Sequence, residues 1–110
     1  IPRETVERCI SNSLCFGVYR GNDQVGFARI ISDFTVFAYL ADVFILEEHR
    51  GKGLSKMLMK EVIAHPQVQG LRRFVLATKD AHGLYKQFGF KEIQHPDRWM
   101  EIHDPDVYNR

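Results

Sequence analysis

Residues 43–63 read VFILEEHRGKGLSKMLMKEVI, and the change of pattern within them decides the fold. The run begins as apolar, β-favouring sequence, passes through Gly51 and Gly53, and continues with apolar residues at helical spacing. The order strand, glycine loop, helix predicts an anion site, because glycines let a ligand approach the backbone and a helix N-terminus offers unpaired N–H groups. A phosphate or pyrophosphate is the expected ligand of this loop.

The loop matches neither of two well-known phosphate-binding patterns. A Walker A loop requires GxxxxGK[ST] and a dinucleotide fingerprint requires GxGxxG, whereas residues 50–55 read RGKGLS. The loop resembles instead the R/Q-x-x-G-x-G/A loop of the GCN5-related N-acetyltransferases (GNAT), in which backbone amides hold the pyrophosphate of acetyl-CoA. Ser55 stands where that family prefers glycine or alanine, which is a departure to another small residue.

A second segment strengthens the resemblance. Residues 80–90 read DAHGLYKQFGF and resemble the family's A-x-x-x-Y-x-x-x-G-F segment, with Ala81, Tyr85, Gly89 and Phe90 on the matching positions. The resemblance implies an α/β (α+β) fold with a mixed, mainly antiparallel central sheet and helices on both faces.

Length and composition predict a single domain over residues 1–110, which the resemblance implies is an N-acetyltransferase domain. A chain of 110 residues with 45% hydrophobic content can build one core and no second one. The expected helices cover residues 2–12, 54–64 and 80–88, the last with Asp80 as its N-cap. The expected strands cover residues 14–20, 25–31, 36–46, 72–78, 90–94 and 98–102. Residues 103–110 are expected to form a loose tail.

The family usually opens with a further strand and helix before the segment that corresponds to residues 2–12. Because this chain begins at Ile1 without a methionine, we expect that the N-terminal strand and helix are missing from it. One edge of the sheet would then be exposed or differently paired. Exposed edges favour pairing with another chain, so a homodimer is one expected outcome.

Composition disfavours several function classes. The 15 basic and 14 acidic residues give a net charge of +1, whereas a nucleic-acid-binding domain of this size is usually more basic. No run approaches the ~18 apolar residues of a membrane-spanning helix, and no signal peptide is recognisable. We therefore expect no nucleic-acid or membrane partner and, by default, a cytoplasmic location. Cys9 and Cys15 are expected to be free buried thiols, with a disulfide or metal pair as the alternative, and no metal is expected.

The resemblance implies acetyl-CoA as the co-substrate and assigns contacts to it. The pantetheine arm would lie along a splayed strand at Val43, Phe44 and Ile45. The pyrophosphate would contact Arg50, Gly51, Lys52, Gly53, Leu54 and Ser55. Thr78 and Ala81 complete the set of expected acetyl-CoA contacts, although many relatives carry an asparagine in place of Thr78.

Acetyl transfer needs a neutral amine, a polariser for the thioester carbonyl and a proton for the departing thiolate. Tyr85 is the candidate for the proton donor, because a phenol with a pKa of about 10 is protonated at neutral pH. The alternative is that Tyr85 caps the core. Asp42 is either an acid at the substrate site or an exposed strand residue, and backbone N–H groups near Ile45 would polarise the carbonyl. His49 is expected to be structural.

The sequence thus predicts an acetyl-CoA-dependent N-acetyltransferase that transfers acetyl directly to a primary amine, without a covalent enzyme intermediate. A small-molecule amine, a peptide N-terminus and a lysine side chain all stay open as the acceptor. The alternative function is a non-catalytic CoA-binding, sensing or interaction module of the same fold. A nucleic-acid-binding domain is a third hypothesis, which the near-neutral charge disfavours. It would use Lys52, Lys56, Lys60, Arg72 and Arg73.

Overall fold

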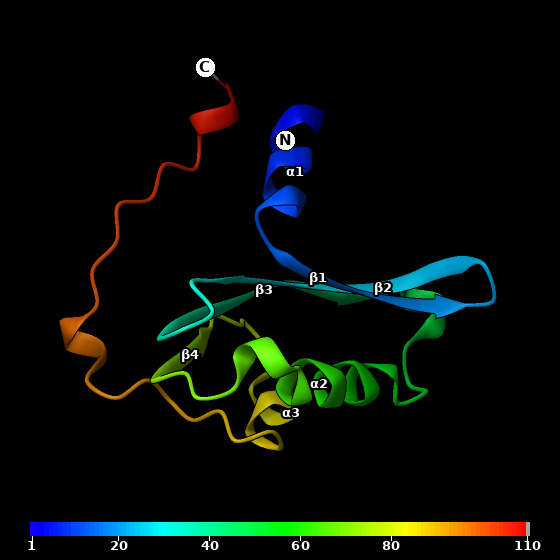
Figure 1. Ribbon diagram of the computed structural model, residues 1–110. Coiled ribbons are helices and arrows are strands. Elements are labelled where there is room, and N and C mark those ends of the chain that lie inside the picture. Colours follow the sequence, from blue (N-terminus) through cyan, green and yellow to red (C-terminus); the bar gives the residue numbers. More distant parts are fainter. Residues whose placement is uncertain (110) are drawn as a thin grey trace.

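A four-stranded sheet organises the computed structural model, which describes residues 1–109 (Figure 1). Its strands, in sheet order, are β1 (Leu14–Arg20), β2 (Asp23–Ser32), β3 (Phe37–Ile45) and β4 (Arg73–Leu76). The first three pair antiparallel, and β4 pairs parallel to β3. A parallel pair needs a crossover connection, and the helix between β3 and β4 supplies it. The mixed, mainly antiparallel sheet expected from the sequence is confirmed.

Helices lie on both sides of this sheet. They are α1 (Arg3–Ser11), α2 (Leu54–Ala64) and α3 (His82–Lys86). In Figure 1, α2 and α3 lie on one side and α1 stands on the other. None of the residues of α1 is buried, whereas α2 buries Leu58, Met59 and Val62. The core therefore lies between the sheet and α2.

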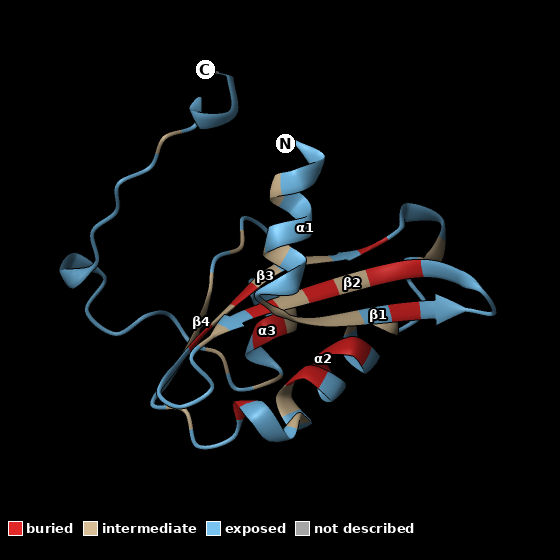
Figure 2. Ribbon diagram, turned by 45° about the horizontal axis from the view of Figure 1, so that its top comes forward, coloured by how far each residue is buried: buried red, intermediate tan, exposed pale blue. Residues whose placement is uncertain are grey.

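Alternation along the strands explains where that core forms. In β2 and β3 the fully or almost fully buried residues include Ala28, Ile30, Ala38 and Leu40, which recur at every second position of each strand. Successive side chains of a strand point to opposite faces, so these four share the face that α2 covers. Figure 2 shows the buried residues gathered along β2 and on the facing side of α2. The helix contributes its buried residues at helical spacing, as an amphipathic helix must.

The bounds expected for the first six elements agree with the structure to within two residues, and those of α2 coincide. The two strands expected at residues 90–94 and 98–102 were wrong. Neither range forms a strand, and a short 3-10 helix, η3 (Pro96–Arg98), lies between them. A β-favouring segment becomes a strand only where a neighbouring backbone accepts its hydrogen bonds, and within residues 1–109 these segments have no such neighbour.

Residues 91–109 instead leave the body of the molecule as an extended arm, seen in orange and red in Figure 1. The arm ends in a second short 3-10 helix, η4 (Val107–Asn109). Residues 103–109, expected to be a loose tail, belong to this arm, and residue 110 lies outside the described residues. The arm carries no part of the core described above.

Candidate active site

The strands β3 and β4 pair only over the first part of β3. Their register runs from Phe37 opposite Arg73 to Leu40 opposite Leu76, whereas β3 continues to Ile45. From residue 41 onward, that edge of β3 has no partner strand in the part of the chain that the structure describes. The free edge can accept an extended ligand as if it were an added strand.

A bulge in β3 lies where the two strands separate. Phe27 is opposite Phe44 and Arg29 is opposite Ala41, so Asp42 and Val43 together face a single residue of β2. Asp42 has φ 55°, in the left-handed region that L-residues rarely adopt. Bulges leave backbone groups unpaired and re-aim side chains, which is typical of strands next to active sites.

The glycine loop after β3 has a defined backbone shape. Gly51 and Gly53 have φ 78° and 77°, and a Cβ at either position would meet no atom within 4 Å. Glycine is therefore required for its backbone conformation and not for space, because the left-handed region costs other residues about 1–2 kcal/mol. The Arg50 side chain donates a hydrogen bond from Nε to the carbonyl of Ile45 at 2.9 Å, which ties the loop to the end of β3.

The first turn of α2 presents free hydrogen-bond donors. The N–H of Met57 closes that turn onto the carbonyl of Gly53 at 3.1 Å. The N–H groups of Leu54, Ser55 and Lys56 precede it and have no intrahelical acceptor. No acidic side chain lies in this first turn, so the positive end of the helix dipole is not neutralised locally. The geometry is that of an anion site.

A cavity of about 290 Å³ lies at these donors. Its lining residues are Ile45, His49, Arg50, Gly51, Gly53, Leu54, Ser55, Lys56 and Leu84. Six of them were expected cofactor contacts, and the structure brings them together. Other expected contacts do not line this cavity: Val43, Phe44, Lys52, Thr78 and Ala81.

His49 and Leu84 line the cavity although sequence analysis did not single them out for it. The Nδ1 atom of His49 is buried and has no hydrogen-bond partner among residues 1–109. A buried polar atom without a partner costs free energy, so a ligand or water that reaches it is stabilised there. In the sequence, the position of His49 one residue before the loop was the signal that could have indicated its place at the cavity. Leu84 comes from α3, and no local pattern in the sequence indicates that it lies at the cavity.

Tyr85 follows Leu84 but lines a different hollow. This groove of about 820 Å³ lies between β4 and residues 90–96. Tyr85 is only 8% exposed, and its ring packs edge-on against Phe90 with ring centroids 6.0 Å apart. Within residues 1–109 nothing hydrogen-bonds to its hydroxyl group. Burial raises the pKa of Tyr85 above its ordinary value, so the phenol keeps its proton throughout the neutral range.

The turn before α3 holds Tyr85 in place. The Thr78 hydroxyl oxygen accepts a hydrogen bond from the N–H of Ala81 at 3.1 Å, and Ala81 is the N-cap of α3. The expectation that Asp80 caps this helix was wrong, because the helix begins two residues later. At its other end Gly89 has φ 93°, and the N–H of Phe90 returns to the carbonyl of Tyr85 at 3.2 Å.

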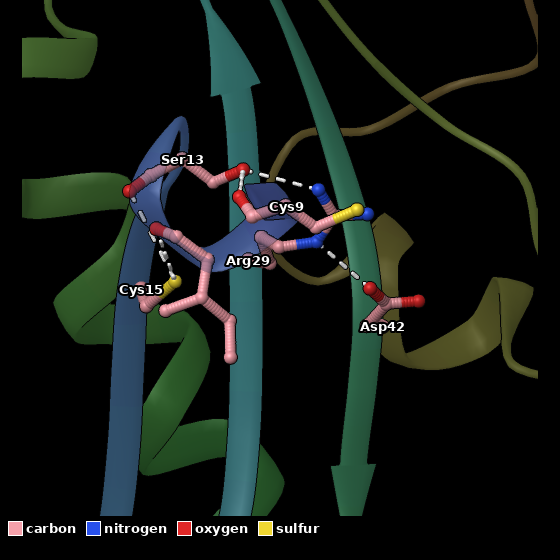
Figure 3. A network of polar contacts seen from close by, with 6 residues as sticks. Cys9, Ser13, Cys15, Arg29 and Asp42 are labelled. Atoms are coloured by element: carbon pink, nitrogen blue, oxygen red, sulfur yellow. Dashed lines mark hydrogen bonds and ion pairs between the residues drawn. The ribbon is translucent and has the colours of Figure 1, made fainter. Parts of the chain in front are cut away.

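Asp42 belongs to a polar network on the α1 side of the sheet (Figure 3). Its Oδ2 atom lies 2.8 Å from Nε of Arg29, whose Nη1 donates to Oγ of Ser13 at 3.0 Å. The Ser13 hydroxyl in turn donates to the carbonyl of Cys9 at 2.6 Å, at the C-terminal end of α1. The Asp42 side chain remains 59% exposed, so its carboxylate is accessible. The network ties the bulge of β3 to α1.

Both cysteines are free thiols, as expected, but the expectation that they are buried was wrong, because both are only partly buried. Burial raises the pKa of Cys15, and Arg29 opposes this shift only in part. Neither Cys9 nor Cys15 lines the cavity at the glycine loop.

Residues 1–109 contain no cluster of three or more side chains that could hold a metal ion. Among the same residues, no helix has the length and apolar character that crossing a bilayer requires.

Comparison with known proteins identifies the family. The family described as acetyltransferase (GNAT) domain matches residues 11–92. A relative from Gibberella zeae, named as an acetyltransferase, is 32% identical over 88% of this chain and 66% of its own length. The chain thus spans slightly less than two thirds of that relative.

Solved structures agree with this match. A crystal structure from Xanthomonas campestris, assigned to the GNAT family, is 55% identical and superposes with a TM-score of 0.94 over 100% of this chain and 78% of its own. A GNAT acetyltransferase of Elizabethkingia anophelis, solved with acetyl-CoA bound, shares the fold with a TM-score of 0.68 at 16% identity, over 96% of this chain and 76% of its own. The strand splay, the glycine loop and these matches lead to one conclusion: the chain belongs to the GNAT acetyltransferase family.

Proposed function

We propose that this protein is an acetyl-CoA-dependent N-acetyltransferase that transfers acetyl directly from CoA to a primary amine. The observation that carries the proposal is the cavity at the N-terminus of α2, which opens beside the unpaired edge of β3. A single ligand that combines a diphosphate with an extended, amide-bearing arm would bind both in the cavity and along the unpaired edge of β3. Acetyl-CoA is such a ligand, and the thioester lies at the far end of its arm.

The diphosphate would be held mainly by main-chain donors. Leu54, Ser55 and Lys56 line the cavity, and their N–H groups have no intrahelical acceptors. A negative charge at such a helix end gains about 0.3–2 kcal/mol. The Lys56 side chain adds a positive charge to the lining, and the unpartnered Nδ1 of His49 offers one further polar contact. The pantetheine arm would follow β3 at Val43, Phe44 and Ile45 by strand-like pairing.

The reaction requires one bond to form and one to break. The neutral amine nitrogen attacks the thioester carbonyl carbon, and the C–S bond breaks as the amide forms. The ammonium proton leaves to water or to Asp42, while the sulfur takes a hydrogen bond or a proton from the Tyr85 hydroxyl. A phenol whose pKa is raised by burial is protonated when the thiolate departs, which supports this role.

The acceptor would approach from the α1 side of the sheet, where the Asp42 carboxylate is exposed. Arg29 pairs with Oδ2 of this carboxylate, and the exposed part of Asp42 can still contact an amine before that amine loses its proton. A small-molecule amine, a peptide N-terminus and a lysine side chain are all compatible with this charge. The cytoplasmic location expected from the sequence stays a prediction.

A thermal-shift titration with acetyl-CoA, followed by thiol-release assays over a panel of amines, tests the proposal. We expect a rise in Tm that saturates with acetyl-CoA, because a ligand that binds only the folded state stabilises it. At least one amine should then accelerate thiol release. Absence of any shift in Tm would contradict the proposed coenzyme.

One observation favours a second candidate, a CoA-binding module without catalysis. Tyr85 lines the groove beside β4 and not the cavity at the glycine loop. If the phenol does not reach the sulfur of the bound coenzyme, acetyl-CoA would still stabilise the protein, but no amine would increase thiol release. The same two assays therefore separate the two functions.

A further inference from the structure

Arg29 keeps cationic hydrogen-bond donors free beside the Asp42 carboxylate. Its Nε atom donates to Oδ2 of Asp42 at 2.8 Å, and its Nη1 atom donates to Oγ of Ser13 at 3.0 Å. Among residues 1–109, Arg29 makes no other side-chain hydrogen bond or ion pair. A guanidinium group can donate from all three of its nitrogens, so both N–H groups on Nη2 are left without a partner.

The two charges are held in fixed positions before any ligand binds. The Arg29 side chain is only 14% exposed, and the Ser13 hydroxyl that orients it donates to the carbonyl of Cys9 at 2.6 Å. The Asp42 side chain is mostly exposed, and Figure 3 shows its second carboxylate oxygen turned away from Arg29. Groups that are already ordered lose little conformational entropy on binding. The pair thus presents an anionic oxygen and cationic donors side by side.

This charge pair lies at the end of the expected coenzyme path. The cavity at the glycine loop includes Ile45, and the pantetheine arm would run from there along β3 to Val43. The next residue is Asp42, which forms the bulge of β3 together with Val43. The thioester, at the far end of the arm, would therefore reach the strand beside the Asp42 carboxylate. An acceptor bound to the charge pair would have its amine next to the reacting carbonyl.

An apolar surface adjoins the charge pair on the same face of the sheet. Phe27 lies two residues before Arg29 in β2, so both side chains point to the same face. Phe44 is opposite Phe27, and their ring centroids are 6.1 Å apart. Phe44 is 44% exposed, so its ring remains accessible. Accessible aromatic rings next to a charged group offer contact area to a ligand with an apolar body.

A free α-amino acid matches this arrangement better than a simple amine does. The pair of Arg29 and Asp42 is neutral as a whole, so it attracts a lone ammonium group only weakly. An α-amino acid carries its ammonium and carboxylate groups on one carbon atom. The ammonium can bind the free oxygen of Asp42 while the carboxylate binds Nη2 of Arg29, and such charge-assisted hydrogen bonds are the strong ones. A peptide N-terminus or a lysine side chain within a protein lacks this neighbouring carboxylate.

We propose that the acceptor is a free α-amino acid with an apolar side chain, and that Arg29 binds its carboxylate. The inference rests on the proposed acetyl transfer and names its substrate class. The ammonium loses a proton to Asp42 or to water, the neutral nitrogen attacks the thioester carbonyl carbon, and the N–C bond forms as the C–S bond breaks. The sulfur leaves as the thiol of CoA after it takes a proton from Tyr85 or from water. The product is an N-acetyl amino acid whose apolar side chain lies on Phe27 and Phe44.

Thiol release with matched acceptors tests the role of the carboxylate. Each apolar amino acid, such as leucine or phenylalanine, is compared with its own carboxamide, which has the same side chain. The carboxamide has the less basic amine, so more of it is neutral and its intrinsic reactivity is favoured. In the wild type we nevertheless expect kcat/KM to be roughly 10-fold higher for the acids, because the amides lose a hydrogen bond between charged groups. Aspartate and lysine should be poorer acceptors than leucine.

Two variants of Arg29 and one control separate recognition from overall charge. R29M removes every donor, so acid and amide should react equally well. R29K keeps the charge on a single nitrogen that cannot bind Asp42 and the acceptor in the geometry of the fork, so the preference should fall to roughly 3-fold or less. The control R20M removes the same charge at the hairpin end of β1, opposite Asp23, and should keep the wild-type preference. A loss of folding alone lowers both reactions and leaves their ratio unchanged.

Binding without turnover gives a second readout. Calorimetric titration of acids and amides into protein saturated with CoA should show the same preference in the wild type and none in R29M. Equal affinity for acid and amide in the wild type, a full acid preference in R29M or R29K, loss of the preference in R20M, or equal use of aspartate and leucine would each overturn the proposal. Absence of thiol release with every amine would contradict the proposed function instead, and the titration would still decide whether Arg29 binds a carboxylate.

Discussion

Replacing Gly53 with alanine tests whether the left-handed backbone at the start of α2 is needed for coenzyme binding. Gly53 is the N-cap of α2 with φ 77°, and Gly70, in the loop before β4, has φ 73°. A Cβ would meet no atom within 4 Å at either position. G53A and G70A therefore impose the same kind of backbone strain without a steric clash, but only Gly53 lines the cavity.

The magnitude follows from the conformation. Alanine in the left-handed region costs about 1–2 kcal/mol, and its lower entropy in the unfolded chain returns about 0.4–1 kcal/mol. We expect G70A to lose about 1 kcal/mol of unfolding free energy and G53A to lose less, because relaxation of the free loop relieves part of the strain at residue 53. The exposed loop at residue 53 can relax when no ligand is present, and binding must then restore the left-handed geometry. A restoration cost of about 1–2 kcal/mol corresponds to roughly a 5- to 30-fold weaker affinity for acetyl-CoA.

Urea denaturation measures the loss of unfolding free energy. Titration calorimetry measures the change in affinity for acetyl-CoA. G53A should bind the coenzyme more weakly than the wild type, and G70A should bind it with wild-type affinity while losing stability. If G53A bound acetyl-CoA as tightly as G70A does, the main-chain geometry at the start of α2 would not be what holds the diphosphate.

Three further predictions concern Tyr85 and the core. Tyr85→Phe should lower amine-dependent thiol release by roughly 100-fold while the Tm shift with acetyl-CoA stays at the wild-type value; equal turnover would remove the phenol from the mechanism. Because burial raises the pKa of Tyr85 above 10.0, its contribution to stability is complete below pH 10 and is lost as the pH rises through the folded-state pKa. Urea midpoints of the wild type should therefore fall more steeply above pH 10 than those of Tyr85→Phe, and parallel curves would contradict this. Met59→Ala, at a fully buried position, should lose about 2–5 kcal/mol in urea denaturation, whereas Met57→Ala, at a position 48% exposed, should lose under about 1 kcal/mol; similar losses would contradict the packing of α2.

Much of the candidate site could be predicted from local sequence. The bounds of α2 coincide with the expectation, because Gly53 permits the turn into the helix and Pro66 prevents the helix from continuing. An anion site at the loop was expected from its glycines and the helix that follows, and the resemblance named the loop residues that line the cavity. Each of these features depends on the conformational preferences of a few neighbouring residues. Their physical cause lies within the segment itself, so no knowledge of distant partners was needed.

Other features required contacts between distant segments. Leu84 reaches the cavity from α3, and Asp42 is held by Arg29 from the neighbouring strand, which no pattern around either residue indicates. The pairing between β3 and β4 ends at Leu40 opposite Leu76, although β3 continues to Ile45, and this end shows only in the folded chain. The strands expected at 90–94 and 98–102 failed because pairing, unlike helix formation, needs a second backbone.

By itself the sequence determined a glycine loop, the helix that follows it and the family to which both belong. Only the tertiary structure decided that β3 keeps a free edge beside this loop, that the phenol of Tyr85 is buried along a separate groove, and that the arm leaves the sheet. The physical reason is the range of the interactions involved. Glycine and proline act on the backbone of adjacent residues, whereas strand pairing and burial depend on segments that meet only in the folded chain.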